Sequence, residues 1–136
     1  MFSKILFPID GSEHSAKTME YVKNLAKVYK CQVVIFHSYE APYVYEVDII
    51  DLIEQFKKEG EAIVKKAEDE LKIVDINTKA INMQGRPGQL IVEVAERESC
   101  DLIIMGTYGL GSVRSLLLGA TSNYVIHHTQ CPVFLV

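Results

Sequence analysis

Four glycines and several hydroxyl residues lie between Gly106 and Ser122, directly after the apolar run DLIIM. Glycines between a strand and a helix let the backbone approach a ligand closely, and the free N–H groups at a helix start attract anions. The stretch therefore has the composition of a phosphate site. Tight turns alone would account for the same glycines, so neighbouring residues have to decide between these two interpretations.

Two standard phosphate motifs come close to this stretch, and neither is present. Gly106 and Gly111 have the spacing of a P-loop, but Ser112 and Val113 follow where that motif requires lysine and then serine or threonine. The dinucleotide pattern G-x-G-x-x-G fails because its last glycine would fall on Arg114. What remains is a strand end, a glycine-rich turn, a helix, and a second helix start after position 119.

Asp10 is the next candidate, because it follows the first predicted strand and precedes Gly11 and Ser12. A carboxylate there can accept hydrogen bonds from ribose hydroxyls, or it can cap the following helix, which is the commoner role of aspartate in such a loop. A phosphorylated receiver domain also has an aspartate after a strand. It needs another after the third strand, where this chain has Met83 and Gln84, so that alternative is weak.

No motif for metal-dependent or nucleophilic catalysis is present in the sequence. The four histidines lack metal-ligand spacing with one another or with cysteine, and there is no G-x-S-x-G elbow (His14, His37, His127, His128). The three cysteines are far apart and form no C-x-x-C pair, so they are interpreted as buried thiols in a reducing cytoplasm (Cys31, Cys100, Cys131). We expect no metal held by protein side chains alone.

Composition narrows the class of protein. The chain has 136 residues, a size that suits one domain, which we expect to span residues 1–136. A net charge of -4 argues against a nucleic-acid partner, since phosphate backbones demand a surplus of lysine and arginine. No apolar run approaches the ~20 residues of a membrane span, and the N-terminus lacks the long apolar region of a secretory signal. We therefore expect a soluble cytoplasmic protein.

Five short apolar runs alternate with four amphipathic segments, which is typical of a parallel sheet covered by helices on both faces. The predicted strands are KILFPI, QVVIFHS, INTKAINM, DLIIMG and PVFLV, at 4–9, 32–38, 76–83, 101–106 and 132–136. The third run alternates in polarity, so we place it at an edge. Ligands of such sheets bind beyond the carboxyl ends of the strands, where the strand order reverses.

Apolar periodicity predicts the helices between these strands. The first begins after Ser12 and Ser15, and the second is about 24 residues long with Gly60 as a tolerated weak point. A short third helix follows RPG, and the fourth runs from Val113 with an interruption at Gly119. Its last apolar contact is expected at position 126. The connection SYEAPYVYEVD, which includes residues 39–48, is long enough to act as a lid.

With these features the chain resembles the universal stress protein family over essentially its full length. The family signature is G, two residues, G, nine residues, G and then serine or threonine; here it reads Gly106, Gly109 and Gly119, followed by Ala120. The resemblance implies a single three-layer α/β domain, Rossmann-like, with a five-stranded parallel sheet in the order 3-2-1-4-5 and four helices. It also implies ATP binding in members that keep the signature.

The resemblance further implies a role for individual residues. Pro8, Ile9 and Asp10 would line the adenosine side, with Asp10 on the ribose. The backbone around Ser38 would meet the adenine, and Met105 and Gly106 would pack under the nucleoside. The phosphates would be held by the remaining positions, with Mg²⁺ bridging phosphate oxygens (Gly109, Gly119, Ala120, Thr121).

One departure from the family pattern bears on affinity. Ala120 has no hydroxyl where the family commonly has serine or threonine, which removes a hydrogen bond to phosphate of about 1.5–3 kcal/mol if charge-assisted. The backbone N–H groups of Ala120 and Thr121 remain, so loss of nucleotide binding does not follow. Weaker binding, or binding of fewer phosphates, is the expectation.

The main hypothesis is a dimeric, ATP-binding stress-response or signalling module with at most slow ATP hydrolysis. Alternatives are a non-nucleotide-binding member that acts as a dimeric interaction module, and an ATP-cleaving adenylyl-transfer enzyme, whose S-G-G-x-D-S loop is replaced here by PIDGSEHS. The apolar strand Pro132 to Val136 carries no charge or bulge to shield its open edge, so a homodimer through it is expected, as in the family.

Overall fold

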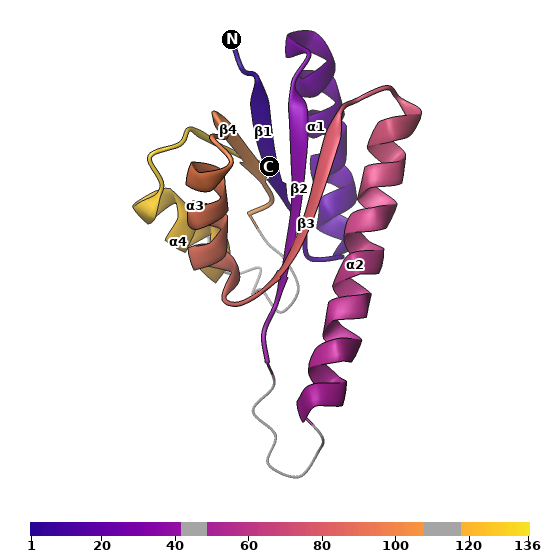
Figure 1. The fold of residues 1–136 in the computed structure, drawn as a ribbon. Helices are drawn as coiled ribbons and strands as arrows, with labels where there is room; N and C mark the ends of the chain where they lie inside the picture. The colour runs from indigo at the N-terminus through magenta and orange to yellow at the C-terminus, as the bar shows by residue number, and fades with distance from the viewer. Residues whose placement is uncertain (42–48, 108–117) are drawn as a thin grey trace.

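The computed structural model describes residues 1–41, 49–107 and 118–136, except for the side chains of Glu13 and His14. Strands and helices alternate along this part of the chain (Figure 1). The strands are β1 (Lys4–Pro8), β2 (Gln32–Tyr39), β3 (Thr78–Gln84), β4 (Leu102–Met105) and β5 (Val133–Leu135). The helices are α1 (Glu13–Tyr29), α2 (Ile49–Ile73), α3 (Pro87–Arg97) and α4 (Ala120–His128).

All five strands are parallel and form one sheet in the order β3-β2-β1-β4-β5. The strand β1 is central: Ile5 lies opposite Val33 of β2 on one side and Leu102 of β4 on the other. The predicted fold class and strand order are confirmed. The order reverses between β1 and β4, since the chain adds β2 and β3 on one side and then β4 and β5 on the other.

Side-chain alternation along the strands builds a separate apolar core on each face of the sheet. Ile5 and Phe7 belong to the core under α1 and α2, whereas Leu6 and Val34 belong to the core under α3 and α4. Figure 1 shows these two helix pairs on opposite sides of the sheet. Both faces of β1 and β2 are covered, which explains their continuous apolar sequences.

The strand β3 lies at the edge of the sheet, as its alternating sequence predicts, and it pairs with β2 on one side only. Its start is later than expected, because Ile76 is buried beneath the end of α2 and the ladder begins at Thr78. Asp75 precedes this point with a φ of 61°, which turns the chain from α2 into the strand. Apolar periodicity in the sequence does not predict such a turn.

Three expectations for single residues change in the structure. Gly60 is not merely a weak point of α2, because a Cβ there would collide with Asn82 and His37. The last apolar contact of α4 is the fully buried Val125, while Ile126 is 36% exposed. Of the cysteines only Cys31 is buried, and the other two are half-buried. The predicted start of the fourth helix at Val113 and most of the predicted lid lie outside the described residues.

Candidate functional site

The carboxyl edge of the sheet at β1 and β4 is the place where the predicted site residues gather. The two strands are hydrogen-bonded neighbours, and the next described helices along the chain, α1 and α4, cover opposite faces of the sheet because the strand order reverses here. An open crevice at such a reversal is the usual ligand site of parallel α/β sheets.

On the β1 side, the backbone continues the ladder for one residue and then turns sharply. The Ile9 N–H donates to the Phe36 carbonyl at 2.8 Å, which holds Ile9 beside β2. Asp10 Oδ1 accepts the backbone N–H of Ser12 at 2.9 Å and, more weakly, the Ser15 hydroxyl at 3.4 Å. The carboxylate of Asp10 therefore supports the start of α1, which is the capping role that residue type alone favours.

Gly11 is required by this turn. Its φ of +82° lies in the left-handed region, which L side chains rarely adopt, and a Cβ there would come within 3.0 Å of Ile63 Cδ1. The turn brings α1 back over β1 while keeping Asp10 at the sheet edge. Ser12 is the N-cap residue of α1, as expected from its type, but its hydroxyl makes no cap hydrogen bond.

Ser38 lies on β2, opposite Met83 of β3, and is two residues beyond Phe36, the partner of Pro8. The preceding residue, His37, is 9% exposed and faces α2, where its Nδ1 lies 2.9 Å from Asn82 Oδ1. This polar pair was not singled out from the sequence. Histidine at a strand end next to asparagine on a neighbouring strand has no sequence signature, because strand register brings the two residues together.

On the β4 side, Met105 is buried, and hydrogen bonds hold the chain where it leaves the sheet. The Thr107 N–H and hydroxyl both donate to the Val136 carbonyl at 3.1 Å, and the Val136 N–H donates to Met105 at 3.0 Å. The end of β4 is therefore fastened to the C-terminal residues. Gly106, which lies between Met105 and Thr107, is half-buried at the sheet edge.

The start of α4 is held against the same strand end. The Gly119 N–H donates to the Thr107 carbonyl at 2.7 Å, and the Ser122 hydroxyl lies within hydrogen-bond distance of both the Thr107 and the Gly119 carbonyls, at 3.2 and 3.1 Å. Gly119 is the N-cap and has no side chain to cap the helix. Ala120 and Thr121 follow in the first turn, where backbone N–H groups have no partner within the helix.

The structure thus brings together Met105, Gly106 and the segment 119–121, and places them next to the end of β1 through the β1–β4 pairing. Ser38 lies farther along the same edge. Gly109 lies outside the described residues. The arrangement can bind an anion at the α4 start and a polar group at Asp10.

Nothing among residues 1–41, 49–107 and 118–136 gathers three or more potential metal-binding side chains. Within those residues, the cysteines lie near the amino ends of the strands, away from this edge. Burial raises the pKa of Cys100 to about 12, helped by the nearby Cys131 thiol, so this thiol is a poor nucleophile. The described helices include none that is long and apolar enough to cross a membrane.

Comparison with known proteins places the fold in a family. The model of the universal stress protein family matches residues 1–136. A universal stress protein of Thermus aquaticus is 34% identical over the whole of this chain and 99% of its own length. The solved structure of MJ0577 from Methanocaldococcus jannaschii is 30% identical, with a TM-score of 0.92 over 100% of this chain and 96% of that one.

Two more distant structures share the fold and hold adenine nucleotides. A universal stress protein in complex with cAMP is 20% identical, with a TM-score of 0.77 over 99% of this chain and 96% of that one. A universal stress family protein of Arabidopsis thaliana with AMP bound is 16% identical, with a TM-score of 0.75 over 98% and 90% of the two chains. At these identities the likeness establishes the fold alone.

Proposed function

The chain belongs to the universal stress protein family, and on that premise we propose that it is a homodimeric, cytoplasmic module that binds ATP and responds to nucleotide levels. The observation that carries the proposal is the start of α4. Gly119 is fastened to Thr107 at the end of β4, so the uncapped first turn of the helix lies at the edge where the strand order reverses. That is the place and the chemistry for a phosphate group.

In this proposal the nucleoside lies between the ends of β1 and β4. Asp10 would accept hydrogen bonds from the ribose hydroxyls, next to Pro8 and Ile9, while Met105 and Gly106 would pack beneath the base and sugar. Asp10 keeps its support of α1 at the same time, because one carboxylate oxygen can accept from Ser12 while the group as a whole offers about four acceptor sites. The adenine would meet the backbone around Ser38.

The phosphates would lie against Gly119, Ala120 and Thr121, and against Gly109. Backbone N–H groups supply the hydrogen bonds and the helix dipole supplies about half a positive charge. Mg²⁺ would be carried by the phosphate oxygens. Related structures with cAMP and AMP support the nucleotide class, and they leave the number of phosphates to experiment.

We propose no efficient catalysis for this site. Its described polar groups are backbone amides, hydroxyls and the Asp10 carboxylate, which is already engaged with the start of α1. Of the two arginines near the proposed site in sequence, Arg86 is exposed at the N-cap of α3, and Arg114 lies outside the described residues. Slow ATP hydrolysis is compatible with this arrangement, whereas fast phosphoryl transfer needs a placed base or cation.

The second part of the proposal is the homodimer. The edge strand β5 pairs with β4 on one side only, and its middle residue Phe134 is 38% exposed. Phe134 lies 5.6 Å from Tyr21 of α1 between ring centroids, so an aromatic surface continues from the strand onto the helix. An open edge with an adjoining apolar surface favours pairing with a second copy of the chain.

Calorimetric titration of ATP with Mg²⁺ into the purified full chain tests nucleotide binding, after mass spectrometry of any nucleotide released on denaturation. We expect wild type to bind ATP and the Gly119→Val variant not to bind it, because a branched side chain at the N-cap would lie where the phosphates approach. Ala80→Val on exposed β3 is the matched control and should bind as wild type does.

The outcomes separate the candidate functions. No binding of any adenine nucleotide at millimolar concentration would overturn the ATP proposal and leave the dimeric interaction module, which the missing hydroxyl at Ala120 favours. Formation of AMP and pyrophosphate would identify an adenylyl-transfer enzyme. Light scattering of wild type and Phe134→Glu measures the dimer independently, and a monomeric wild type would refute that part.

A further inference from the structure

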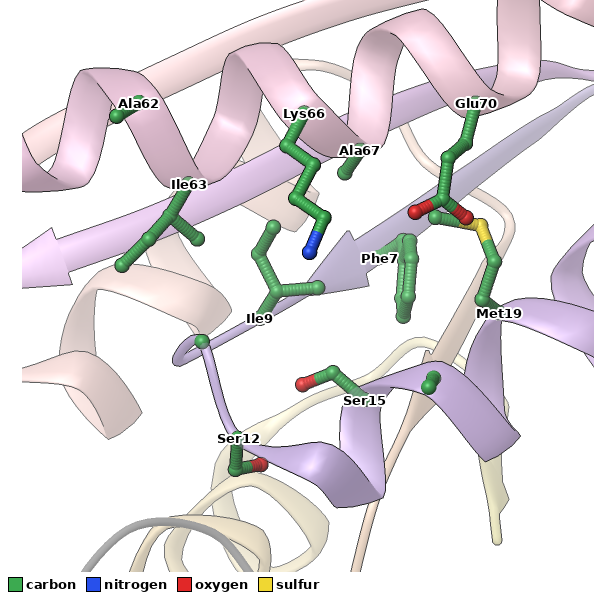
Figure 2. A pocket seen from close by; sticks show the side chains of 12 residues that line it. Phe7, Ile9, Ser12, Ser15, Met19, Ala62, Ile63, Lys66, Ala67 and Glu70 are labelled. Atoms are coloured by element: carbon green, nitrogen blue, oxygen red, sulfur yellow. The ribbon is translucent and has the colours of Figure 1, made fainter.

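A cavity of about 340 Å³ opens between α1 and α2, above the end of β1 (Figure 2). The two helices are centred on different strands: α2 covers β2 and β3, whereas α1 lies over β1 and its two neighbours β2 and β4. Where the helices separate, the side chains that face the gap include small ones. They are Ser15 and Ala16 from α1 and Ala62 and Ala67 from α2.

The floor of this cavity is apolar. Phe7 of β1, Ile9 just after that strand and Met19 of α1 form it, and all three lie on the α1/α2 face of the sheet. The proposed phosphate site belongs to α4, which covers the other face. The cavity is therefore a separate feature, although Ile9 adjoins both.

One cation at this cavity, the exposed Lys66, has no ion-pair partner among the described residues. Figure 2 shows the Lys66 side chain descending from α2 with its ammonium group directed toward the floor beside Ile9. Within the described ranges Lys66 forms no ion pair and no hydrogen bond. Glu70, one turn farther along, lies 3.9 Å from Lys23 and so has a cationic neighbour of its own. Among the described residues, the cavity thus combines an apolar floor with one lysine that has no carboxylate partner.

We propose that this cavity binds a small amphipathic carboxylate, with its apolar body on Phe7, Ile9 and Met19 and its carboxylate on Lys66. A volume of about 340 Å³ is at the lower end of small-molecule pockets, which span ~300–1,000 Å³. At the ~30 Å³ that a water-sized atom occupies in a liquid, it holds on the order of ten non-hydrogen atoms. An ion pair next to an apolar floor is stronger than one in open water, because the bound ligand excludes solvent from one side.

The size argues against a whole nucleotide, and the charge argues against a neutral or cationic ligand. A purely apolar molecule would leave the Lys66 ammonium without a partner at the rim. An amine would meet the same charge with its own, with Glu70 at the far end already close to Lys23. A single carboxylate on a short aliphatic or aromatic body fits both the floor and the cation.

The test uses octanoate as the probe and ¹⁵N-labelled full-length protein. Titration at millimolar concentration should shift the amide resonances of Ala16, Ile63 and Ala67, all of which line the cavity. Octanamide has the same chain without the charge and should bind about tenfold more weakly, which is the usual scale for one charge-assisted hydrogen bond. Octylamine should bind no better than octanamide.

Two variants localise the binding. Lys66→Gln should weaken octanoate about tenfold and leave octanamide unchanged. The matched control is Lys65→Gln on the same helix, since Lys65 pairs with Asp69 at 2.6 Å and does not line the cavity; it should bind octanoate as wild type does. Ala16→Phe places a ring in the gap and should abolish binding of both probes. If Ala16→Phe does not fold, the comparison of Lys66→Gln with Lys65→Gln still tests the proposal.

Several results would overturn the proposal. They are no shift with octanoate, equal binding of octanoate and octanamide, an equal effect of the two lysine variants, or resonance shifts confined to residues outside the cavity. Competitive displacement of octanoate by ATP would show that the probe occupies the nucleotide site instead. Octanoate binding that persists in Gly119→Val supports a separate site even if ATP binds nowhere.

Discussion

Replacing Gly60 with alanine is expected to destabilise the protein, although alanine is the better helix former. Gly60 lies in the middle of α2, above a polar pair formed by His37 of β2 and Asn82 of β3. A Cβ at position 60 would come within 2.7 Å of His37 Nδ1 and 2.8 Å of Asn82 Cγ. Real Cβ contacts are longer, so the helix or the pair must move.

The pair cannot move without losing hydrogen bonds. Asn82 Nδ2 donates to the Lys57 carbonyl of α2 at 2.9 Å, so its Oδ1 is left to accept from His37. Nδ1 of His37 therefore carries the proton of this hydrogen bond, and with His37 only 9% exposed, water is a poor substitute for Asn82. The glycine, the asparagine and the histidine form one unit that joins α2 to the sheet.

The magnitudes decide the sign of the change. Glycine to alanine inside a helix gains about 1 kcal/mol from propensity. Overpacking costs about 1–3 kcal/mol, and leaving a buried donor unpaired costs about 1–3 kcal/mol more. The net loss in the free energy of unfolding is then about 1–5 kcal/mol, with ~2 kcal/mol as the central value when the pair relaxes in part.

Chemical denaturation with urea, followed by circular dichroism, measures this loss. Ala62→Gly on the same helix is the matched control, because Ala62 is exposed and its change should cost only about 1 kcal/mol of propensity. In the background of Asn82→Ala, the Gly60→Ala substitution should cost less, since the Asn82 atoms that obstruct the Cβ are gone and His37 is no longer held by Asn82 and can shift. A gain of about 1 kcal/mol for Gly60→Ala in the wild-type background would refute the reasoning.

The remaining predictions concern α3, the nucleotide site and acid stability. Gly88→Ala should cost about 1–3 kcal/mol in the same assay, because its Cβ would come within 2.9 Å of the Tyr124 ring. Ala120→Ser should raise ATP affinity by about tenfold in calorimetry, and no change would exclude this position from the phosphate contacts. Burial alone would raise the pKa of Asp101, but the hydrogen bonds from Ser3 outweigh it and lower that pKa below its usual value of 3.8. This stabilisation is present above the usual pKa and is lost as pH falls through the lowered one, so acid titration of Asp101→Asn should show a shallower loss of stability than wild type.

Much of the fold follows from patterns that a sequence carries directly. The continuous apolar runs of β1, β2, β4 and β5 predict strands buried on both faces, which is confirmed for the first three. For β5 it is wrong, because this strand lies at an edge of the sheet and Phe134 is 38% exposed. The alternation in β3 predicts an edge strand, which is confirmed. These patterns are readable in the sequence because each position needs only an apolar residue where it faces the core and a polar one where it faces water. Element ends are less well predicted, as the late start of β3 at Thr78 shows.

The candidate site was partly predictable for a different reason. The glycine spacing from Gly106 to Gly119 is a local signal, since a backbone that must approach a ligand excludes side chains. The fastening of Gly119 to the Thr107 carbonyl has no such signal, because it depends on where β4 ends in space. Asp10 illustrates the limit: its position after a strand is readable, but its hydrogen bonds to the start of α1 are visible only in three dimensions.

By itself the sequence determined the class of fold and the family, and it supplied the residues that we propose for a nucleotide site, because apolar periodicity and glycine positions are properties of short segments. Only the tertiary structure decided why Gly60 is a glycine, and that Lys66 points into an apolar cavity where no described residue forms an ion pair with it. Both depend on residues far apart in the chain, Gly60 against Asn82 and Lys66 against Ile9. Their distances are set by helix packing and strand register, which no local pattern encodes.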